Sequence, residues 1–233
     1  MLNAIIMASG LGTRMRPLTE TQPKPLIKVC GKPMIETVID ALENRGVDKI
    51  FVVVGYLKEQ FGYLTRKYPN LSLIENPDYA AINNISSVYY AREVLKLGAT
   101  FICEADLYIA NPLIFADKSE QSRYYGKFVN GRSDDWVFDA DGDGFITRVG
   151  KFGNDCYNMV GLSYFNPTDA LTLAEKITAA YGAEGYEKLF WDDVVNANLS
   201  QLRLKIEPVK AGDIIEIDTV EELEAANKTF KRQ

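Results

Sequence analysis

The residues best suited to chemistry stand in one loop near the N-terminus. An apolar run, residues 4–8, is followed by Gly10, Gly12, Arg14 and, further on, Lys24. A short apolar run bounded by glycine predicts a buried strand. Glycines let backbone N–H groups approach an anion closely, and cationic side chains suit phosphate oxygens. The pattern therefore predicts a loop that holds a polyphosphate. The alternative is an ordinary strand-to-helix turn that carries positive charges by chance.

Two common phosphate-binding loops do not fit this stretch. A dinucleotide fingerprint needs a third Gly or Ala, and Met15 stands at that position. A Walker A loop ends in Gly-Lys-Ser/Thr, whereas Gly31 and Lys32 are followed by Pro33. The loop thus belongs to another kind of phosphate site.

Lys24 lies between two prolines, Pro23 and Pro25. A residue before proline is pushed toward extended geometry, so this backbone is stiff. We expect Lys24 to present its ammonium group to the phosphates. The alternative is a solvated surface lysine.

Three carboxylates follow predicted strands. Asp106 comes after the strand 100–103, and Asp218 after the strand 214–217, with Glu216 two residues before it. Alternate residues of a strand share a face. Carboxylates beside phosphate oxygens suit Mg²⁺, so we predict a magnesium site at Asp106, Glu216 and Asp218. The alternative is that Asp106 and Asp218 cap a turn and a helix.

Both tryptophans stand beside aspartates. Trp136 follows Asp134 and Asp135, and Trp191 lies between Phe190 and Asp192. Aromatic faces and carboxylates together form a receptor for an organic cation. The alternative is that these rings belong to the core.

The composition excludes several other functions. The chain has 233 residues and no histidine, so histidine-dependent triads, dyads and metal sites are excluded. Its three cysteines are far apart and predict neither a disulfide framework nor a metal site. A net charge of -6 argues against general nucleic-acid binding. The N-terminal apolar run is too short for a signal peptide or a membrane span, so we expect a soluble cytoplasmic protein without membrane insertion.

The acidic run from Asp139 to Ile146 imitates the start of an EF-hand loop. Position twelve of that loop is Gly150 rather than glutamate. We therefore predict a hairpin turn there.

Alternating strands and helices predict an α/β fold with a Rossmann-like, mostly parallel (mixed) sheet flanked by helices. Extra strands are inserted in the second half. We expect one domain, 1–233, with a nucleotide-binding half at 1–120 and an acceptor-binding half at 121–233. Predicted strands lie at 4–7, 26–29, 50–54, 71–74, 100–103, 123–129, 136–138, 145–149, 159–165, 203–207 and 214–217. Predicted helices lie at 33–45, 58–67, 86–96, 167–181, 189–198 and 219–230.

The chain resembles the sugar-phosphate nucleotidyltransferases in its N-terminal segments. The residues that carry this likeness are 11–19, 23–26 and 31–35. The similarity is closer to one branch, the bacterial CTP:phosphocholine cytidylyltransferases. That branch is indicated by residues 54–61, Asn83, Asn84, Ser86, Ser87, Asp106, Trp136, Trp191, Asp192 and 216–218.

The resemblance implies a role for each motif residue. Lys24, Arg14 and Asp106 would be catalytic, and Asp106, Glu216 and Asp218 would hold Mg²⁺. The nucleotide would contact Ala8, Gly10, Gly12, Thr13, Arg14, Lys24, Asn84 and Ser86. The acceptor's choline group would contact Trp136, Phe190, Trp191 and Asp192. Two departures stand out: the family has Tyr where this chain has Phe190, and residues 149–152 lack the segment usual in hexose-1-phosphate enzymes.

The activity implied is Mg²⁺-dependent transfer from CTP to phosphocholine, which gives CDP-choline and pyrophosphate. The partners would be CTP and a small phosphorylated amino-alcohol. Alternatives are transfer to 2-aminoethylphosphonate or phosphoethanolamine, transfer to a sugar 1-phosphate, and a non-catalytic nucleotide-binding regulatory domain.

Overall fold

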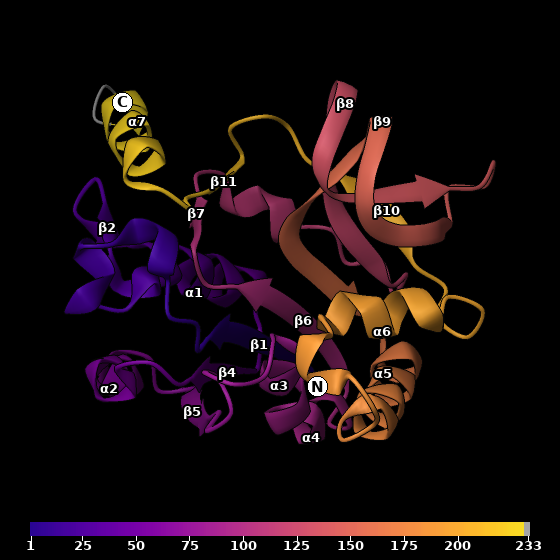
Figure 1. Ribbon diagram of the computed structural model, residues 1–233, viewed down its shortest axis with the longest axis horizontal. Helices are drawn as coiled ribbons and strands as arrows, with labels where there is room; N and C mark the ends of the chain where they lie inside the picture. The colour runs from indigo at the N-terminus through magenta and orange to yellow at the C-terminus, as the bar shows by residue number, and fades with distance from the viewer. Residues whose placement is uncertain (231–233) are drawn as a thin grey trace.

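A mixed sheet of seven strands runs through the molecule in the order β10-β8-β9-β6-β1-β4-β5 (Figure 1). The computed structural model describes residues 1–230. The strands are β1 (Leu2–Ala8), β4 (Lys49–Val54), β5 (Leu71–Glu75), β6 (Ala99–Glu104), β8 (Arg123–Ala140), β9 (Ile146–Phe165) and β10 (Lys205–Pro208). Strands β6, β1, β4 and β5 are parallel, whereas β9 runs antiparallel to both β6 and β8. The predicted α/β, Rossmann-like mixed sheet is confirmed.

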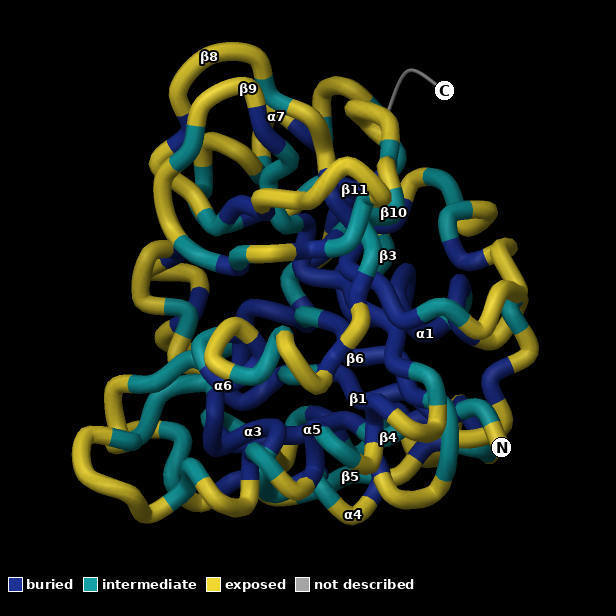
Figure 2. Tube along the Cα trace, turned by 90° about the vertical axis from the view of Figure 1, so that its right-hand side faces the viewer, coloured by how far each residue is buried: buried dark blue, intermediate teal, exposed yellow. Residues whose placement is uncertain are grey.

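Helices cover both faces of this sheet because its central strands are apolar on both sides. In β1, Ile6 packs into one core and Ile5 into the other. The first core is covered by α1 (Met34–Arg45) and α2 (Gly62–Lys67). The second is covered by α3 (Ile85–Tyr90), α4 (Arg92–Leu95), α5 (Pro167–Ala180) and α6 (Trp191–Ala197). The buried chain is concentrated in these central strands, and the outer ends of β8 and β9 are exposed (Figure 2).

The predicted short strands of the second half are wrong in number. Residues 123–129 and 136–138 belong to the single strand β8, and residues 146–149 and 159–165 to the single strand β9. Asn, Gly and Asp between them are typical of turns, but pairing between β8 and β9 keeps the segments extended through several register shifts. The predicted hairpin turn is confirmed, since Asp141 N–H donates to the Phe145 carbonyl at 2.9 Å.

Most predicted helices are confirmed, with two interruptions. The helix 58–67 is a 3-10 turn (Lys58–Phe61) that becomes α2 at Gly62, and the helix 86–96 divides at Ala91. The other 3-10 turns are Thr13–Met15, Leu18–Glu20, Lys24–Leu26, Pro112–Phe115 and Tyr186–Lys188. Within residues 1–230, no helix is long and apolar enough to cross a membrane.

Two small sheets complete the fold. One is a local hairpin, and the other joins residues 214–216 to the first half of the chain. Strand β2 (Lys28–Val29) pairs with β3 (Lys32–Pro33), and β11 (Ile214–Glu216) pairs with β7 (Leu107–Ile109). Beyond β11, Ile217 N–H donates to the Asp106 carbonyl at 3.2 Å, and α7 (Val220–Phe230) follows. The carboxyl ends of β1 and β6 thus meet the segment after β11 at one edge, where ligands of open α/β sheets bind.

Candidate active site

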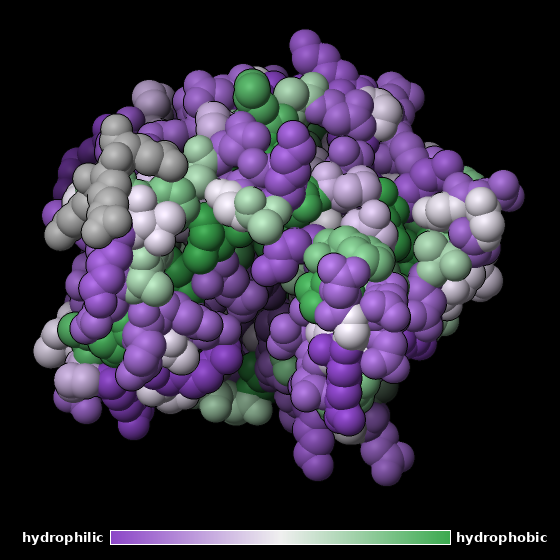
Figure 3. Space-filling model, turned by 90° about the horizontal axis from the view of Figure 1, so that it is seen from above, coloured by the Kyte–Doolittle hydropathy of each residue, from purple (hydrophilic) through white to green (hydrophobic). Residues whose placement is uncertain are grey.

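A cleft of about 400 Å³ opens at this edge. The surface seen from above is hollowed near its middle (Figure 3). Both halves of the chain contribute to the cleft, since Glu216 and Asp218 lie in its wall beside residues of the first half. It is lined by Met7, Ala8, Ser9, Gly10, Gly12, Thr13, Arg14, Lys24, Pro25, Tyr79, Ile82, Asn83, Asn84, Ser86, Ser87, Glu104, Ala105, Asp106, Glu216 and Asp218.

The glycine loop after β1 is shaped by Gly12. Its φ of 61° lies in the left-handed region, and its carbonyl accepts a hydrogen bond from Thr19 Oγ1 at 2.8 Å. A Cβ at this position would lie 2.9 Å from Cβ of Lys24. Glycine therefore allows the loop to pass directly against Lys24.

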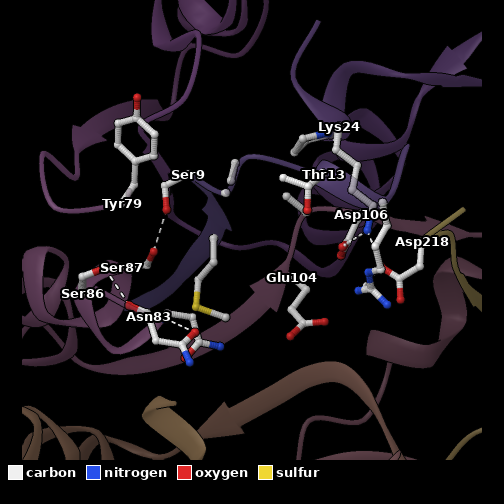
Figure 4. Close-up of a pocket in the computed structure, with 18 of the residues that line it drawn as sticks. Ser9, Thr13, Lys24, Tyr79, Asn83, Ser86, Ser87, Glu104, Asp106 and Asp218 are labelled. Carbon is white, nitrogen blue, oxygen red and sulfur yellow. Dashed lines mark hydrogen bonds and ion pairs between the residues drawn. The ribbon is translucent and has the colours of Figure 1, made fainter. Parts of the chain in front are cut away.

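Lys24 is not a surface lysine. Its side chain is only 9 % exposed, and its Nζ lies 2.6 Å from Asp106 Oδ2 and 2.5 Å from Asp218 Oδ1 (Figure 4). Burial alone would lower the pKa of Lys24, but the two carboxylates outweigh it and raise the pKa. Lys24 thus stays cationic at the end of the cleft. Arg14, which is largely exposed, adds a second contact to Asp218 Oδ1 at 2.6 Å.

Asp106, Glu216 and Asp218 converge, with one carboxylate oxygen from each within 4.8 Å of the others. Although Glu216 is exposed as a residue, removal of its carboxyl from solvent and the charges of Asp106 and Asp218 raise its pKa to about 8. Within residues 1–230, Asp106 Oδ1 is buried without a hydrogen-bond partner. Crowded negative charge and an orphaned oxygen fit a hard divalent cation such as Mg²⁺.

The alternative that Asp218 caps the last helix is wrong. Thr219 Oγ1 accepts the N–H of Glu222 at 3.2 Å and so caps α7. The Asp218 carboxylate is held by Lys24 and Arg14 instead.

Glu104, which the sequence places at the ligand-binding edge without a role, lines the cleft. It ends β6, and Figure 4 shows its carboxyl group turned away from Lys24. Burial, followed by the charges of Asp106 and Glu216, raises its pKa well above the usual range. The carboxyl group of Glu104 has no hydrogen bond or ion pair among residues 1–230. Its position two residues before Asp106, on the same strand end, was the available signal.

Asn84 and Ser86 line the opposite wall of the cleft. Ser86 Oγ accepts from Asn76 Nδ2 at 2.9 Å, within a buried network that also includes Ser9 and Ser87. Asn84 Oδ1 accepts the Trp191 N–H at 2.9 Å, at the start of α6. This wall of the cleft is therefore bonded to the segment that presents Phe190.

Two of the residues predicted to contact the acceptor, Trp136 and Phe190, line a second cavity of about 340 Å³. The rings of Trp136 and Phe190 meet edge to face, with centroids 5.3 Å apart. The ammonium of Lys151 lies 6.0 Å from the Trp136 ring centre and 5.7 Å from that of Phe190. The lining is Trp136, Arg148, Val149, Gly150, Lys151, Lys188, Phe190, Asp193 and Asn196. This positive charge beside the two rings is not predicted by the sequence pattern.

Trp191 and Asp192, which are also predicted to contact the acceptor, line neither cavity. Trp191 is 3 % exposed and packs on Tyr124 and Phe165 in the core. Asp192 is equally buried and accepts a hydrogen bond from Tyr124 Oη at 2.9 Å. Burial raises the pKa of Asp192 to about 7, and the bond from Tyr124 lowers it only in part.

Residues 3–121 match the family model described as nucleotidyl transferase. Two relatives extend the similarity over the chain. The 2-aminoethylphosphonate cytidylyltransferase of Lancefieldella rimae is 58% identical over 96% of this chain and 91% of its own. The choline-phosphate cytidylyltransferase of Streptococcus pneumoniae is 32% identical over 100% of both chains.

Solved structures show the same fold. The CTP:phosphocholine cytidylyltransferase from Streptococcus pneumoniae superposes with a TM-score of 0.90 and 32% identity over 98% of both chains. The inositol-1-phosphate CTP transferase from T. maritima gives a TM-score of 0.75 at 15% identity, over 97% of this chain and 95% of its own. The second likeness concerns the fold alone.

Proposed function

This chain belongs to the nucleotidyl transferase family, and we propose that it transfers the cytidylyl group of CTP to 2-aminoethylphosphonate and releases pyrophosphate. The main support for cytidylyl transfer is the buried ammonium group of Lys24, which lies between Asp106 and Asp218 and next to the glycine loop. The 58% identity to an enzyme named for this acceptor supports the choice of substrate.

The glycine loop and its cations form the triphosphate side of the site. Gly10 and Gly12 leave the backbone open to an anion, while Arg14 and Lys24 supply positive charge. Charge develops on the phosphate oxygens during transfer, and fixed cations stabilise it most where water is excluded. Lys24 fits this role because its neighbours already hold its position.

The nucleophile is an oxygen of the acceptor, which attacks the α-phosphorus of CTP opposite the leaving pyrophosphate. That oxygen is already anionic near neutral pH, since the second pKa of a phosphate monoester is about 6 and a phosphonate also keeps an ionised oxygen. No general base is required. The absence of histidine is consistent with this mechanism, in which positioning and charge neutralisation do the work.

The amino end of the acceptor has an acidic counterpart in the cleft. Glu104 lines it, lies outside the group of carboxylates that would hold Mg²⁺, and is crowded by other negative charge. A primary ammonium donates hydrogen bonds to carboxylate oxygens and would relieve that repulsion. We therefore assign Glu104 to the acceptor's –NH₃⁺ group.

Asp106, Glu216 and Asp218 would hold Mg²⁺, which would neutralise phosphate charge when bound. We expect activity to be lost in EDTA and restored by Mg²⁺. Asp106→Asn should raise the Mg²⁺ concentration needed for half-maximal rate by about tenfold or more. Full activity in a thoroughly chelated enzyme would exclude this metal site.

Phosphocholine is the second candidate acceptor. It is supported by the Trp136–Phe190 pair, which offers aromatic faces to an organic cation, and by the 32% identical choline-phosphate enzyme. The larger identity and the position of Glu104 favour the primary amine.

The test is a pyrophosphate-release assay. CTP, UTP, ATP and GTP are each combined with 2-aminoethylphosphonate, phosphocholine, phosphoethanolamine and glucose 1-phosphate. We expect the highest kcat/KM for CTP with 2-aminoethylphosphonate. A preference for glucose 1-phosphate would overturn the acceptor class, and no pyrophosphate with any pair would indicate a regulatory nucleotide-binding domain.

A further inference from the structure

The ammonium group of Lys151 lies against the rings of Trp136 and Phe190 in the second cavity. We propose that Lys151 is a specificity residue: it excludes quaternary ammonium acceptors from the Trp136–Phe190 pair and thereby restricts the enzyme to primary amines. The inference rests on the proposed cytidylyl transfer and names the acceptor class of that reaction.

The position of Lys151 is fixed by strand pairing. Trp136 of β8 and Lys151 of β9 are direct cross-strand partners, so the backbone itself places the two side chains side by side. Phe190 completes the arrangement from the segment before α6. The ammonium lies within about 6 Å of both rings, the range of a cation–π contact.

One further cation strengthens this effect. Lys188 also lines the cavity and has no ion pair among residues 1–230, whereas Arg148 is paired with Asp139. Asp193 is the one lining carboxylate, and its Oδ2 accepts the Phe190 N–H at 2.8 Å. With Lys151 and Lys188 against Asp193, an organic cation that entered this cavity would meet a net positive charge.

The two kinds of amine depend on different partners. A quaternary ammonium has no N–H group, so aromatic faces supply most of its specific binding. A primary ammonium can be held by hydrogen bonds to a carboxylate, which Glu104 provides in the cleft. Occupation of the aromatic faces by Lys151 therefore penalises phosphocholine and leaves 2-aminoethylphosphonate little affected.

The first test compares Lys151→Met, which removes the charge but keeps an unbranched chain, with the control Lys151→Arg, which keeps the charge. kcat/KM is measured for phosphocholine and 2-aminoethylphosphonate at saturating CTP. We expect Lys151→Met to raise the phosphocholine value about tenfold, the size of one recovered cation–π contact. The 2-aminoethylphosphonate value should change by less than about threefold, and Lys151→Arg should keep the wild-type ratio. An unchanged ratio in Lys151→Met would overturn the proposal.

The second test does not depend on catalysis. Tetramethylammonium chloride is titrated calorimetrically into the full-length wild type, Lys151→Met, and the double variant Lys151→Met with Trp136→Ala. We expect affinity to increase about fivefold or more in Lys151→Met and to return to the wild-type level in the double variant. Equal affinity in wild type and Lys151→Met would refute the inference. If neither acceptor is used by the wild type, the proposed function fails, and this titration alone decides the role of Lys151.

Discussion

The cleft and the second cavity each contain a lysine, and the two lysines are used in opposite ways. Lys24 is buried between two carboxylates, in a site that has more negative than positive charge. Lys151 is exposed, faces two aromatic rings, and has no ion pair among residues 1–230. Under the proposed function, the cleft neutralises charge on the reacting phosphates. Under the further inference, the second cavity repels organic cations.

The largest effect is expected for Lys24→Ala. Loss of the ammonium removes charge stabilisation at the reacting phosphates and leaves Asp106 and Asp218 to repel each other, so kcat should fall about 10²–10³-fold. Pyrophosphate release measures the rate, and circular dichroism checks the fold. Lys96→Ala, at an exposed pair with Glu93, is the matched control and should stay near wild type. Near-normal turnover in Lys24→Ala would refute the role of the cleft lysine.

Gly12→Ala should have the next largest effect. Its added methyl group would lie 2.9 Å from Lys24 Cβ, at a positive φ, so we expect kcat/KM for CTP to fall about tenfold. Gly31→Ala is the control, because Gly31 also has a positive φ but open space around it. Equal losses in both variants would show that backbone strain, rather than the approach to Lys24, causes the effect.

The variant Asp192→Asn tests whether Asp192 is a buried structural carboxyl or part of the acceptor site. The folded pKa is about 7 and the unfolded value about 3.9. The native state therefore holds a proton that the unfolded state has released within this window. This carboxyl accordingly makes the free energy of unfolding fall as pH rises from about 4 to about 7. Relative to Asp192→Asn, the wild type should lose about 4 kcal/mol across that window, since each unit of pKa difference corresponds to about 1.4 kcal/mol.

Urea denaturation at several pH values measures this difference, with the exposed Asp134→Asn as control. A constant difference between wild type and Asp192→Asn would contradict the assignment. A large rise in the acceptor KM of Asp192→Asn would instead return Asp192 to the acceptor site.

Trp136→Ala should have the smallest effect. If the aromatic pair does not hold the amino group, KM for 2-aminoethylphosphonate should rise by less than about threefold and KM for CTP should not change. Steady-state titration of each substrate checks both values. A rise of tenfold or more for the phosphonate would place the acceptor in the second cavity and remove the contrast between the two lysines.

The cleft could be anticipated from sequence because its parts are local. Each part can be recognised from a few consecutive residues: the short apolar strand β1, the glycine loop after it, and Asp106 after the buried strand β6. The parallel arrangement then brings them to one edge, which general rules for open sheets predict.

The side-chain arrangement of the second half could not be predicted in the same way. The neighbourhood of Lys151 and Trp136 depends on the register of β8 and β9, which the irregular pattern of Asn, Gly and Asp residues does not specify. Trp191 and Asp192 look like a binding pair in sequence. Tyr124, however, supplies a partner that allows the carboxyl to be buried.

The contact between Lys24 and Asp218 joins residues 194 positions apart in the chain. During translation the strands β1 and β4 emerge long before Asp218 does. A nascent chain can therefore assemble its parallel strands while Lys24 still lacks one of its two carboxylates. Under the proposed function, catalytic competence would then arise only after the segment that carries Asp218 has left the ribosome, and products terminated before Asp218 would lack this carboxylate.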